Sequence, residues 1–218
     1  MMMRSDKFLK SVFRILSVLT ILYGTVSTRR QKRCESSEID IAGRQGVKVE
    51  PVSISRVVVG IEGRGIEDKG DEMRFQFKTK EPSGMLFYAR RSSNNDEMIA
   101  LRMENGHLFY TIRCSYAHAR LRLPIITRMD DGHWHTVQFH RKRFQGFIEL
   151  DKRTYFRHYP VNCGGFDSFV FGGIAPEDNI DITRAVGKVD HFEGCFRNLE
   201  TSVPFFNHIS YTAVSVCK

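Results

Sequence analysis

The chain has 218 residues, of which 41% are hydrophobic, 27% charged and 11% aromatic, and it carries a formal net charge of +8 at pH 7. This composition is typical of one globular domain and argues against a disordered chain. The charge does not indicate a nucleic-acid-binding protein, because residues 1–33 hold eight basic residues and one acidic residue, which leaves 25 basic and 24 acidic residues in the remainder.

Residues 1–27 have the layout of a secretory signal peptide. Four basic residues precede an apolar run from Ile15 to Val26: Arg4, Lys7, Lys10 and Arg14. This run is too short to cross a hydrocarbon core of about 30 Å as a helix, so an uncleaved membrane anchor is the weaker alternative. We therefore expect a secreted, extracellular protein without a membrane span.

Residues 28–50 form a basic and polar lead-in without sustained periodicity. The run "RQKR", Arg30 to Arg33, resembles the site cut by furin-type processing proteases, although basic runs of four residues also occur by chance. Cleavage there would start the mature chain near Cys34. Five cysteines suit an oxidising compartment if four are paired and one is left over, and no Cys-x-x-Cys spacing supports a zinc ribbon.

Residues 51–218 have the pattern of a domain made of short strands. Met73, Phe75 and Phe77 alternate with polar residues, which is the period of a strand with one buried face. Similar runs follow, rich in β-branched and aromatic residues: "GMLFYAR", "EMIALRM", "HLFYTIR", "WHTVQFH", "QGFIELD" and "SFVFGG". Turn residues such as Asn105-Gly106 separate them. The pattern predicts an all-β fold, an antiparallel β-sandwich or jelly roll around a Phe-rich core.

The order of these motifs resembles a laminin G-like domain, as found in laminins, agrin and neurexins. The matching stretches run from about Val57 to Cys217 and read "RFQFKTKEPSGMLFYA", "MIALRMENGHLFYTI", "DDGHWHTVQFHR", "GFIELD", "FVFGG" and "FEGCFRNL". The resemblance implies a concanavalin-like sandwich of two curved antiparallel sheets. It also implies a single-domain extracellular adhesion or ligand-binding module that is not an enzyme.

Many laminin G-like domains bind calcium at one rim of the sandwich, and the resemblance maps that site onto this chain. The ligand positions fall on Glu97, with Asp96 beside it, on the carbonyl of Cys114 and on Gly164. Calcium takes six to eight oxygens and needs charged donors, whereas Gly164 has no side chain. The sequence therefore predicts a degraded site and disfavours calcium as a cofactor.

The resemblance also bears on the cysteines. It implies a C-terminal disulfide between Cys195 and Cys217, and it places Cys114 opposite Cys163 at the calcium rim. We hypothesise that Cys114 and Cys163 form a disulfide in the place of the ion, with two free or partly buried thiols as the alternative. Cys34 is then left over for a disulfide-linked dimer, a bond to another protein, or a free thiol.

Three histidines surround the only tryptophan of the chain in "DDGHWHTVQFHR". By strand parity His140 falls on the side of Trp134 and is separated from His133 and His135, so the three cannot converge on one metal ion. We expect Trp134 to anchor the core and the histidines to cap the strand or face solvent.

Binding is expected through basic loops at the sheet edges. Five residues are candidates for a sulfated glycan of the heparan-sulfate type, because guanidinium groups donate paired hydrogen bonds to sulfate: Arg90, Arg91, Arg141, Lys142 and Arg143. The other expected partner is an extracellular or cell-surface protein without glycan.

Two further functions remain as alternatives. A carbohydrate-active enzyme of the sandwich fold would need paired carboxylates, for which Glu149 and Asp151 are the candidates on one strand face. A carrier of a small apolar ligand would need an empty interior, and the large number of Phe residues favours a filled one.

Overall fold

The computed structural model describes residues 39–61, 65–67, 69–114, 117–123, 127–142, 145–156, 163–203 and 206–218. The expected signal peptide, the basic run at 30–33 and Cys34 lie outside these residues. In the part of the chain that is described, no helix has the length and apolar character needed to cross a membrane.

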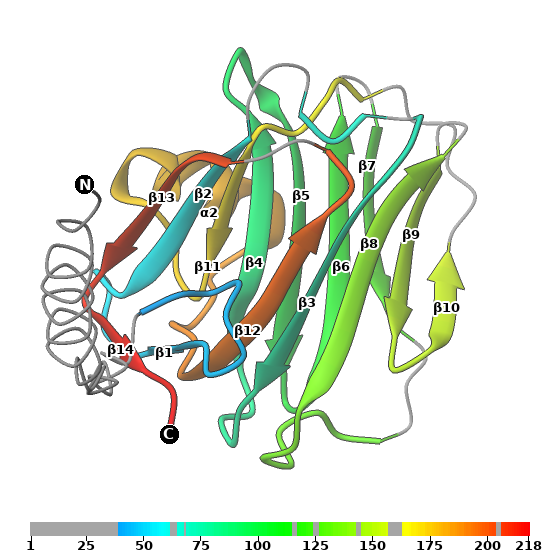
Figure 1. Cartoon of the computed structure of the whole chain (residues 1–218). Coiled ribbons are helices and arrows are strands. Elements are labelled where there is room, and N and C mark those ends of the chain that lie inside the picture. Colours follow the sequence, from blue (N-terminus) through cyan, green and yellow to red (C-terminus); the bar gives the residue numbers. More distant parts are fainter. Residues whose placement is uncertain are drawn as a thin grey trace, which may run out of the picture. The chain divides into compact units, whose positions relative to one another are not determined.

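Two seven-stranded antiparallel sheets stack face to face, and they confirm the predicted β-sandwich (Figure 1). The first sheet has the order β10 (Arg153–Phe156), β9 (Gln145–Leu150), β8 (His135–Lys142), β3 (Lys69–Lys78), β12 (Gly194–Thr201), β1 (Val47–Val49) and β14 (Val214–Val216). The second has the order β13 (Phe206–Thr212), β2 (Arg56–Ile61), β11 (Ser168–Phe171), β4 (Gly84–Arg91), β5 (Asn94–Glu104), β6 (His107–Cys114) and β7 (Ala117–Arg122).

Phenylalanine rings fill the space between the two sheets. Phe75 of β3 packs edge-on against Phe87 of β4 and Phe171 of β11, with ring centroids 5.5 and 5.2 Å apart. Phe196 of β12 extends this cluster toward Phe192 at 4.8 Å. All five side chains are fully buried. Such interlocking rings stabilise the sandwich through burial of apolar area and favour a filled core over a ligand cavity.

A short helical segment covers the outer face of the second sheet. It consists of the 3-10 turn η1 (Pro176–Asp178) and the helix α2 (Asn179–Val186). Ile182 and Val186 of α2 pack on Met85 and Tyr88 of β4 in a second buried cluster. This explains why "MLFYA" in β4 is an unbroken apolar run, since both faces of the strand are covered.

The lead-in expected at 28–50 contributes its last part to the sandwich. β1 pairs with both β12 and β14, and Ile41 and Val47 are buried in the main core. A three-residue strand offers too little alternation to be recognised as a strand from sequence, so a domain start at residue 51 is too late.

The Asn105-Gly106 turn joins β5 and β6 as predicted. Both residues have positive φ, 51° for Asn105 and 76° for Gly106, which is the requirement of a two-residue hairpin turn of type I′. The turn holds Leu108 opposite Met103 and so fixes the register of the two strands.

Candidate functional site

The rim predicted from the calcium mapping lies where β6 and β8 end. A disulfide joins Cys114, the last residue of β6, to Cys163, with a Cα–Cα distance of 5.2 Å. It is the pair expected from the sequence, and its Cα–Cα distance is within the range for disulfides. The bond fixes the segment at 163–164 to the edge of the second sheet.

Glu97 is buried beneath this segment, with 4% of its surface exposed. Its Oε2 accepts a hydrogen bond of 2.7 Å from the backbone N–H of Gly164 and lies 3.7 Å from Nη1 of Arg91. A Cβ on Gly164 would overlap that guanidinium. Arg91 therefore occupies the space where a side-chain ligand at position 164 would have to stand.

Arg141 fills the rim from the side of β8. Its Nη1 donates a hydrogen bond of 2.6 Å to the carbonyl oxygen of Gly164, and its Nη2 donates one of 3.0 Å to that of Cys163. The guanidinium also lies 5.1 Å from the ring centroid of Phe166. Nearby Tyr110 is fully buried, and this burial raises the pKa of its hydroxyl, although Arg141 opposes the rise.

The residues of the rim do not fit a calcium ion. Two carbonyl oxygens accept from Arg141, and the one described carboxylate, Glu97, accepts from Gly164 and faces Arg91. The two guanidinium groups supply the two positive charges that calcium would carry. The side chain of Asp96 lies outside the described residues.

The five residues expected to bind a glycan do not form one surface cluster. Arg141 is only 2% exposed, because it continues the inward-facing series His135, Val137 and Phe139 of β8, so it does not lie in an exposed basic loop as expected. Arg90 forms an ion pair of 3.0 Å with Asp178 beside α2. Arg91 is engaged by Glu97, Lys142 is exposed, and Arg143 lies outside the described residues.

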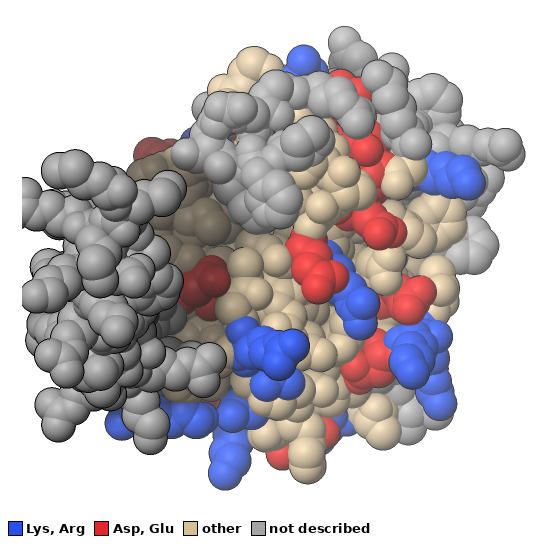
Figure 2. Space-filling view, in the orientation of Figure 1, with Lys and Arg blue, Asp and Glu red and all other residues tan. Residues whose placement is uncertain are grey.

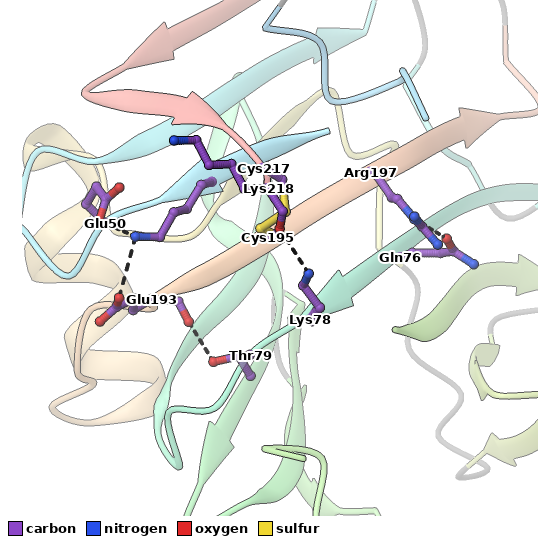
Figure 3. The surroundings of a disulfide bond; sticks show 10 residues. Glu50, Gln76, Lys78, Thr79, Glu193, Cys195, Arg197, Cys217 and Lys218 are labelled. Atoms are coloured by element: carbon purple, nitrogen blue, oxygen red, sulfur yellow. Dashed lines mark hydrogen bonds and ion pairs between the residues drawn. A yellow bond between two sulfur atoms is a disulfide. The ribbon is translucent and has the colours of Figure 1, made fainter. Parts of the chain in front are cut away.

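A groove opens at the other end of β8. It has a volume of about 580 Å³ and is lined by Lys48, Glu50, Lys78, Thr79, Lys80, Glu81, Gly132, Glu193, Gly194, Cys195, Ser215, Val216 and Lys218. The disulfide Cys195–Cys217, with a Cα–Cα distance of 5.8 Å, ties β12 to the chain beyond β14 at this groove (Figure 3). It is again the pair expected from the sequence.

Charge is partly compensated inside the groove. The Nζ of Lys48 lies 2.9 Å from Oε2 of Glu50 and 3.7 Å from Oε1 of Glu193. The hydrogen bond to Glu50 is the largest effect on the ammonium and raises the pKa of Lys48. The hydroxyl of Thr79 donates a hydrogen bond of 2.6 Å to the carbonyl oxygen of Glu193 and holds that segment in place.

The sequence predicted that Trp134 anchors the core, and this prediction is wrong. It precedes β8, is partly exposed on the outer side of the first sheet, and lies against two cations, Lys78 at 5.0 Å and Arg197 at 3.8 Å from the ring centroid. His135 points inward instead, against Phe77, with ring centroids 5.4 Å apart. Parity along β8, counted from the buried Val137 and Phe139, places odd-numbered residues inside.

His135 joins the loop before β8 to the turn after β9. His135 hydrogen-bonds through Nδ1 to Asp151 at 2.8 Å and through Nε2 to Asp131 at 3.1 Å. His133 is exposed, and His140 packs edge-on against Phe147 with ring centroids 4.7 Å apart. Within the described ranges, no three His, Cys, Asp or Glu side chains converge as metal ligands.

Comparisons with known proteins agree with this geometry. The family model described as "Laminin G domain" matches residues 77–202. Laminin subunit alpha-4 of Mus musculus is 28% identical over 160 residues, which cover 69% of this chain and 8% of that protein. The basement membrane-specific heparan sulfate proteoglycan core protein of Mus musculus is 26% identical over 172 residues, covering 75% of this chain and 4% of that protein.

Among solved structures, the mouse laminin alpha1 chain, domains LG4-5, matches with a TM-score of 0.64. The match covers 81% of this chain and 47% of that chain at 17% identity, so it concerns the fold alone. The chain spans less than a tenth of the length of the two curated relatives.

Proposed function

Because the chain belongs to the laminin G domain family, we propose that it is a secreted extracellular binding module that recognises a matrix or cell-surface protein, or a sulfated glycan, without calcium. The names of its relatives, a laminin subunit and a basement-membrane proteoglycan, support an extracellular setting. The observation that carries the calcium-free mode of binding is the Arg91–Glu97 pair, which fills the rim together with Arg141.

The two carboxylates that were candidates for catalysis, Glu149 and Asp151, accept hydrogen bonds within the fold, which favours a binding role over catalysis. Asp151 lies in the tight turn after β9, with φ of 47°, and its carboxylate accepts from His135 and from the backbone N–H of Thr136. Glu149 lies within β9 and accepts from Thr154 at 3.4 Å. Asp151 is thus committed to holding a turn and does not form an open carboxylate pair with Glu149.

Thermal unfolding in calcium and in EDTA tests the calcium-free rim. We expect the same melting temperature for the full chain in both, since a ligand that binds only the folded state would raise it. The double variant Arg91→Ala/Gly164→Asp removes the guanidinium and restores a carboxylate, and we expect it to gain a calcium-dependent rise. A rise in the unmodified chain would contradict the proposal.

Secretion and processing have their own test. The full chain, expressed in a secretory host, should accumulate in the medium, and the N-terminus of the secreted protein should fall after the apolar run or after Arg33. Retention of the intact N-terminus in a membrane fraction would overturn secretion and leave the sandwich assignment untouched.

A further inference from the structure

The strand β13 is the last strand of the second sheet, and one of its edges faces no other strand among the described residues (Figure 1). It is seven residues long, whereas the other terminal strands, β7, β10 and β14, have six, four and three residues. Its sequence, "FNHISYT", contains no Lys, Arg, Asp, Glu or Pro. Proteins usually protect sheet edges with charges, prolines or short strands, so a long uncharged edge is typical of a strand that pairs with another chain.

The other edges and the outer face of the first sheet are better suited to solvent. The edge strand β7, "AHARLR", contains two arginines, and β10 and β14 are too short to offer more than a few hydrogen bonds. Figure 2 shows Lys and Arg interspersed with Asp and Glu over the face formed by the first sheet, which is typical of a solvated surface. β13 is therefore the edge that fits a further strand best.

The pairing of β13 with β2 shows which of its backbone groups are free. The backbone N–H of Ile61 donates a hydrogen bond of 2.8 Å to the carbonyl oxygen of Asp167, next to β11. Odd-numbered residues of β2 therefore bond toward β11, and even-numbered residues bond toward β13. Ser210 lies opposite an even-numbered residue and bonds to β2. The N–H and C=O groups of its neighbours Ile209 and Tyr211 consequently point to the free edge.

We propose that two copies of the chain pair through antiparallel β13 strands, with Ser210 at the twofold axis. In this register Ile209 of one copy lies opposite Tyr211 of the other, and each such pair exchanges two hydrogen bonds. The free N–H and C=O groups of both residues are then satisfied. The two copies of Ser210 form the non-hydrogen-bonded pair between them, where side chains of opposite strands come closest.

The side chains of β13 suit this pairing. Ile209 and Tyr211 pack on the edge of the main core and remain partly exposed, so their contact across the two strands buries apolar surface beside the existing core. A strand that meets its own copy meets its own charges, and like charges opposite each other destabilise a sheet. Since β13 has no Lys, Arg, Asp or Glu, it is compatible with itself.

Exposed apolar side chains gather near the same edge. Four large hydrophobic residues are exposed in the part of the chain that the structure describes, and three of them are Ile39, Val52 and Ile54, at 37, 45 and 56%. The loop that carries Val52 and Ile54 is fastened to the end of β13, because the hydroxyl of Ser55 donates a hydrogen bond of 2.8 Å to the carbonyl oxygen of Ala213. Grouped apolar exposure of this kind marks an interaction site more often than scattered residues do.

The cysteine left over after the two disulfides favours a second copy over an unrelated protein. The backbone N–H of Ile41 donates a hydrogen bond of 3.2 Å to the hydroxyl of Tyr211, so the start of the described chain lies beside β13. Cys34 precedes Ile41 by seven residues, which span at most about 25 Å. In the proposed register the two copies of Tyr211 are close to each other, so two copies of Cys34 are within reach of a disulfide.

Sedimentation velocity over a concentration series tests the pairing. The full chain should form a dimer, and Cys34→Ser should keep it, because the strands and not the disulfide hold the two copies. Ser210→Lys places two ammonium groups side by side at the axis and should raise the dissociation constant about tenfold or more. Ser210→Glu should do the same. An equimolar mixture of these two variants should restore the dimer, since lysine then faces glutamate.

Thr154→Lys is the matched control. Thr154 is exposed on the edge strand β10 of the first sheet, where it lies opposite Glu149. The substitution adds the same charge to an edge strand that takes no part in the proposed pairing. This variant should dimerise like the unmodified chain.

Amide hydrogen exchange adds a measurement at single residues. In the dimer the N–H groups of Ile209 and Tyr211 should be protected, and Ser210→Lys should release both. The N–H at position 210 bonds to β2 and should stay protected in both proteins, which shows that the variant keeps its fold. Protection that alternates along β13 in this way is specific to a strand paired on both edges.

Three outcomes would overturn the proposal. A monomer in which Ile209 and Tyr211 exchange freely leaves the edge open to a strand of another protein. A monomer in which both are protected assigns the edge to a contact within the chain. A dimer that Ser210→Lys leaves intact is held by another surface or, if Cys34→Ser abolishes it, by a disulfide alone. The inference goes beyond the proposed function, and because its readouts involve neither calcium nor a matrix partner, either proposal can fail alone.

Discussion

Arg141 donates a hydrogen bond of 2.6 Å to the carbonyl oxygen of Gly164 from inside the sandwich, although the two residues belong to different structural segments. The contact joins the inward face of β8 to the segment held by the Cys114–Cys163 disulfide. Its guanidinium is thereby part of the core and serves as a structural cation.

The first prediction concerns this contact. Replacing Arg141 with Leu leaves the carbonyl oxygens of Cys163 and Gly164 without their buried donor and should lower the free energy of unfolding by about 3 kcal/mol. Urea denaturation measures the change. Lys142→Gln, at the exposed neighbouring position, is the control and should stay within about 0.5 kcal/mol. If Arg141→Leu lowers the free energy of unfolding no more than Lys142→Gln does, Arg141 does not stabilise the fold.

The central strands and their order along the chain were predicted from the alternation of apolar residues and from turn residues. The buried face of β8 was predicted incorrectly at Trp134. Trp134 was expected to anchor the core, yet the inward series is His135, Val137, Phe139 and Arg141. A buried His and a buried Arg break the hydrophobic pattern from which the buried face of a strand is read. Asp151, which hydrogen-bonds to His135, and Gly164, whose carbonyl oxygen accepts from Arg141, are 16 and 23 residues away in the sequence, so a local pattern does not show these partners.

The groove was beyond sequence reasoning for a different reason. Its lysines come from β1, from β3 and the turn after it, and from the chain after β14, and each appears alone in a polar stretch. Only the sheet order, which places β1 between β12 and β14, brings them together. By contrast, the rim could be located in advance because the family resemblance fixed its register.

The second prediction compares the two disulfides. In the chain-entropy estimate, a bond that spans a longer loop stabilises more, and the sequence separations are 49 for Cys114–Cys163 and 22 for Cys195–Cys217. Replacing both cysteines of a pair with Ala should cost about 4 kcal/mol for the first and about 3 kcal/mol for the second.

Guanidinium denaturation of each double variant measures this order, and a non-reducing peptide map of the unmodified protein verifies the pairs. A smaller cost for removing Cys114–Cys163 would show that Arg141 and Glu97 hold the rim without the bond.

The third prediction concerns the attachment of η1 and α2. Tyr88 donates a hydrogen bond of 2.7 Å to Oδ2 of Asp178 and accepts one of 3.1 Å from the backbone N–H of Ala175. Burial, together with Asp178, raises the pKa of the Tyr88 hydroxyl, so it remains a neutral donor. Tyr88→Phe should therefore cost about 1–2 kcal/mol, since Asp178 loses a donor while buried.

Amide hydrogen exchange should locate this loss in residues 175–186, which form the covering segment. Tyr155→Phe is the control, because no hydrogen bond to its hydroxyl is found among the described residues. Exchange that increases uniformly over both sheets would contradict a local role for Tyr88.

The fourth prediction concerns acid stability at the loop that precedes β8. Arg128 donates a hydrogen bond of 2.9 Å from Nε to Oδ1 of Asp130, and Nη2 donates to the other carboxylate oxygen. This hydrogen bond is the largest effect that lowers the pKa of Asp130 below its ordinary value. A carboxyl group whose pKa is lower in the folded state stabilises the protein above its unfolded pKa of about 3.9, and this stabilisation is lost as the pH falls through the folded pKa.

Arg128→Ala should therefore lower the free energy of unfolding near neutral pH, and the difference from the unmodified chain should disappear in acid, where Asp130 is protonated in both proteins. Urea denaturation over a pH series measures the difference. Lys188→Ala removes the same charge from an exposed position that has no ion pair among the described residues, and its effect should not follow the titration of Asp130. A difference for Arg128→Ala that persists unchanged into acid would mean that the side chain stabilises the loop by packing on the Gly106 turn instead of through the carboxylate.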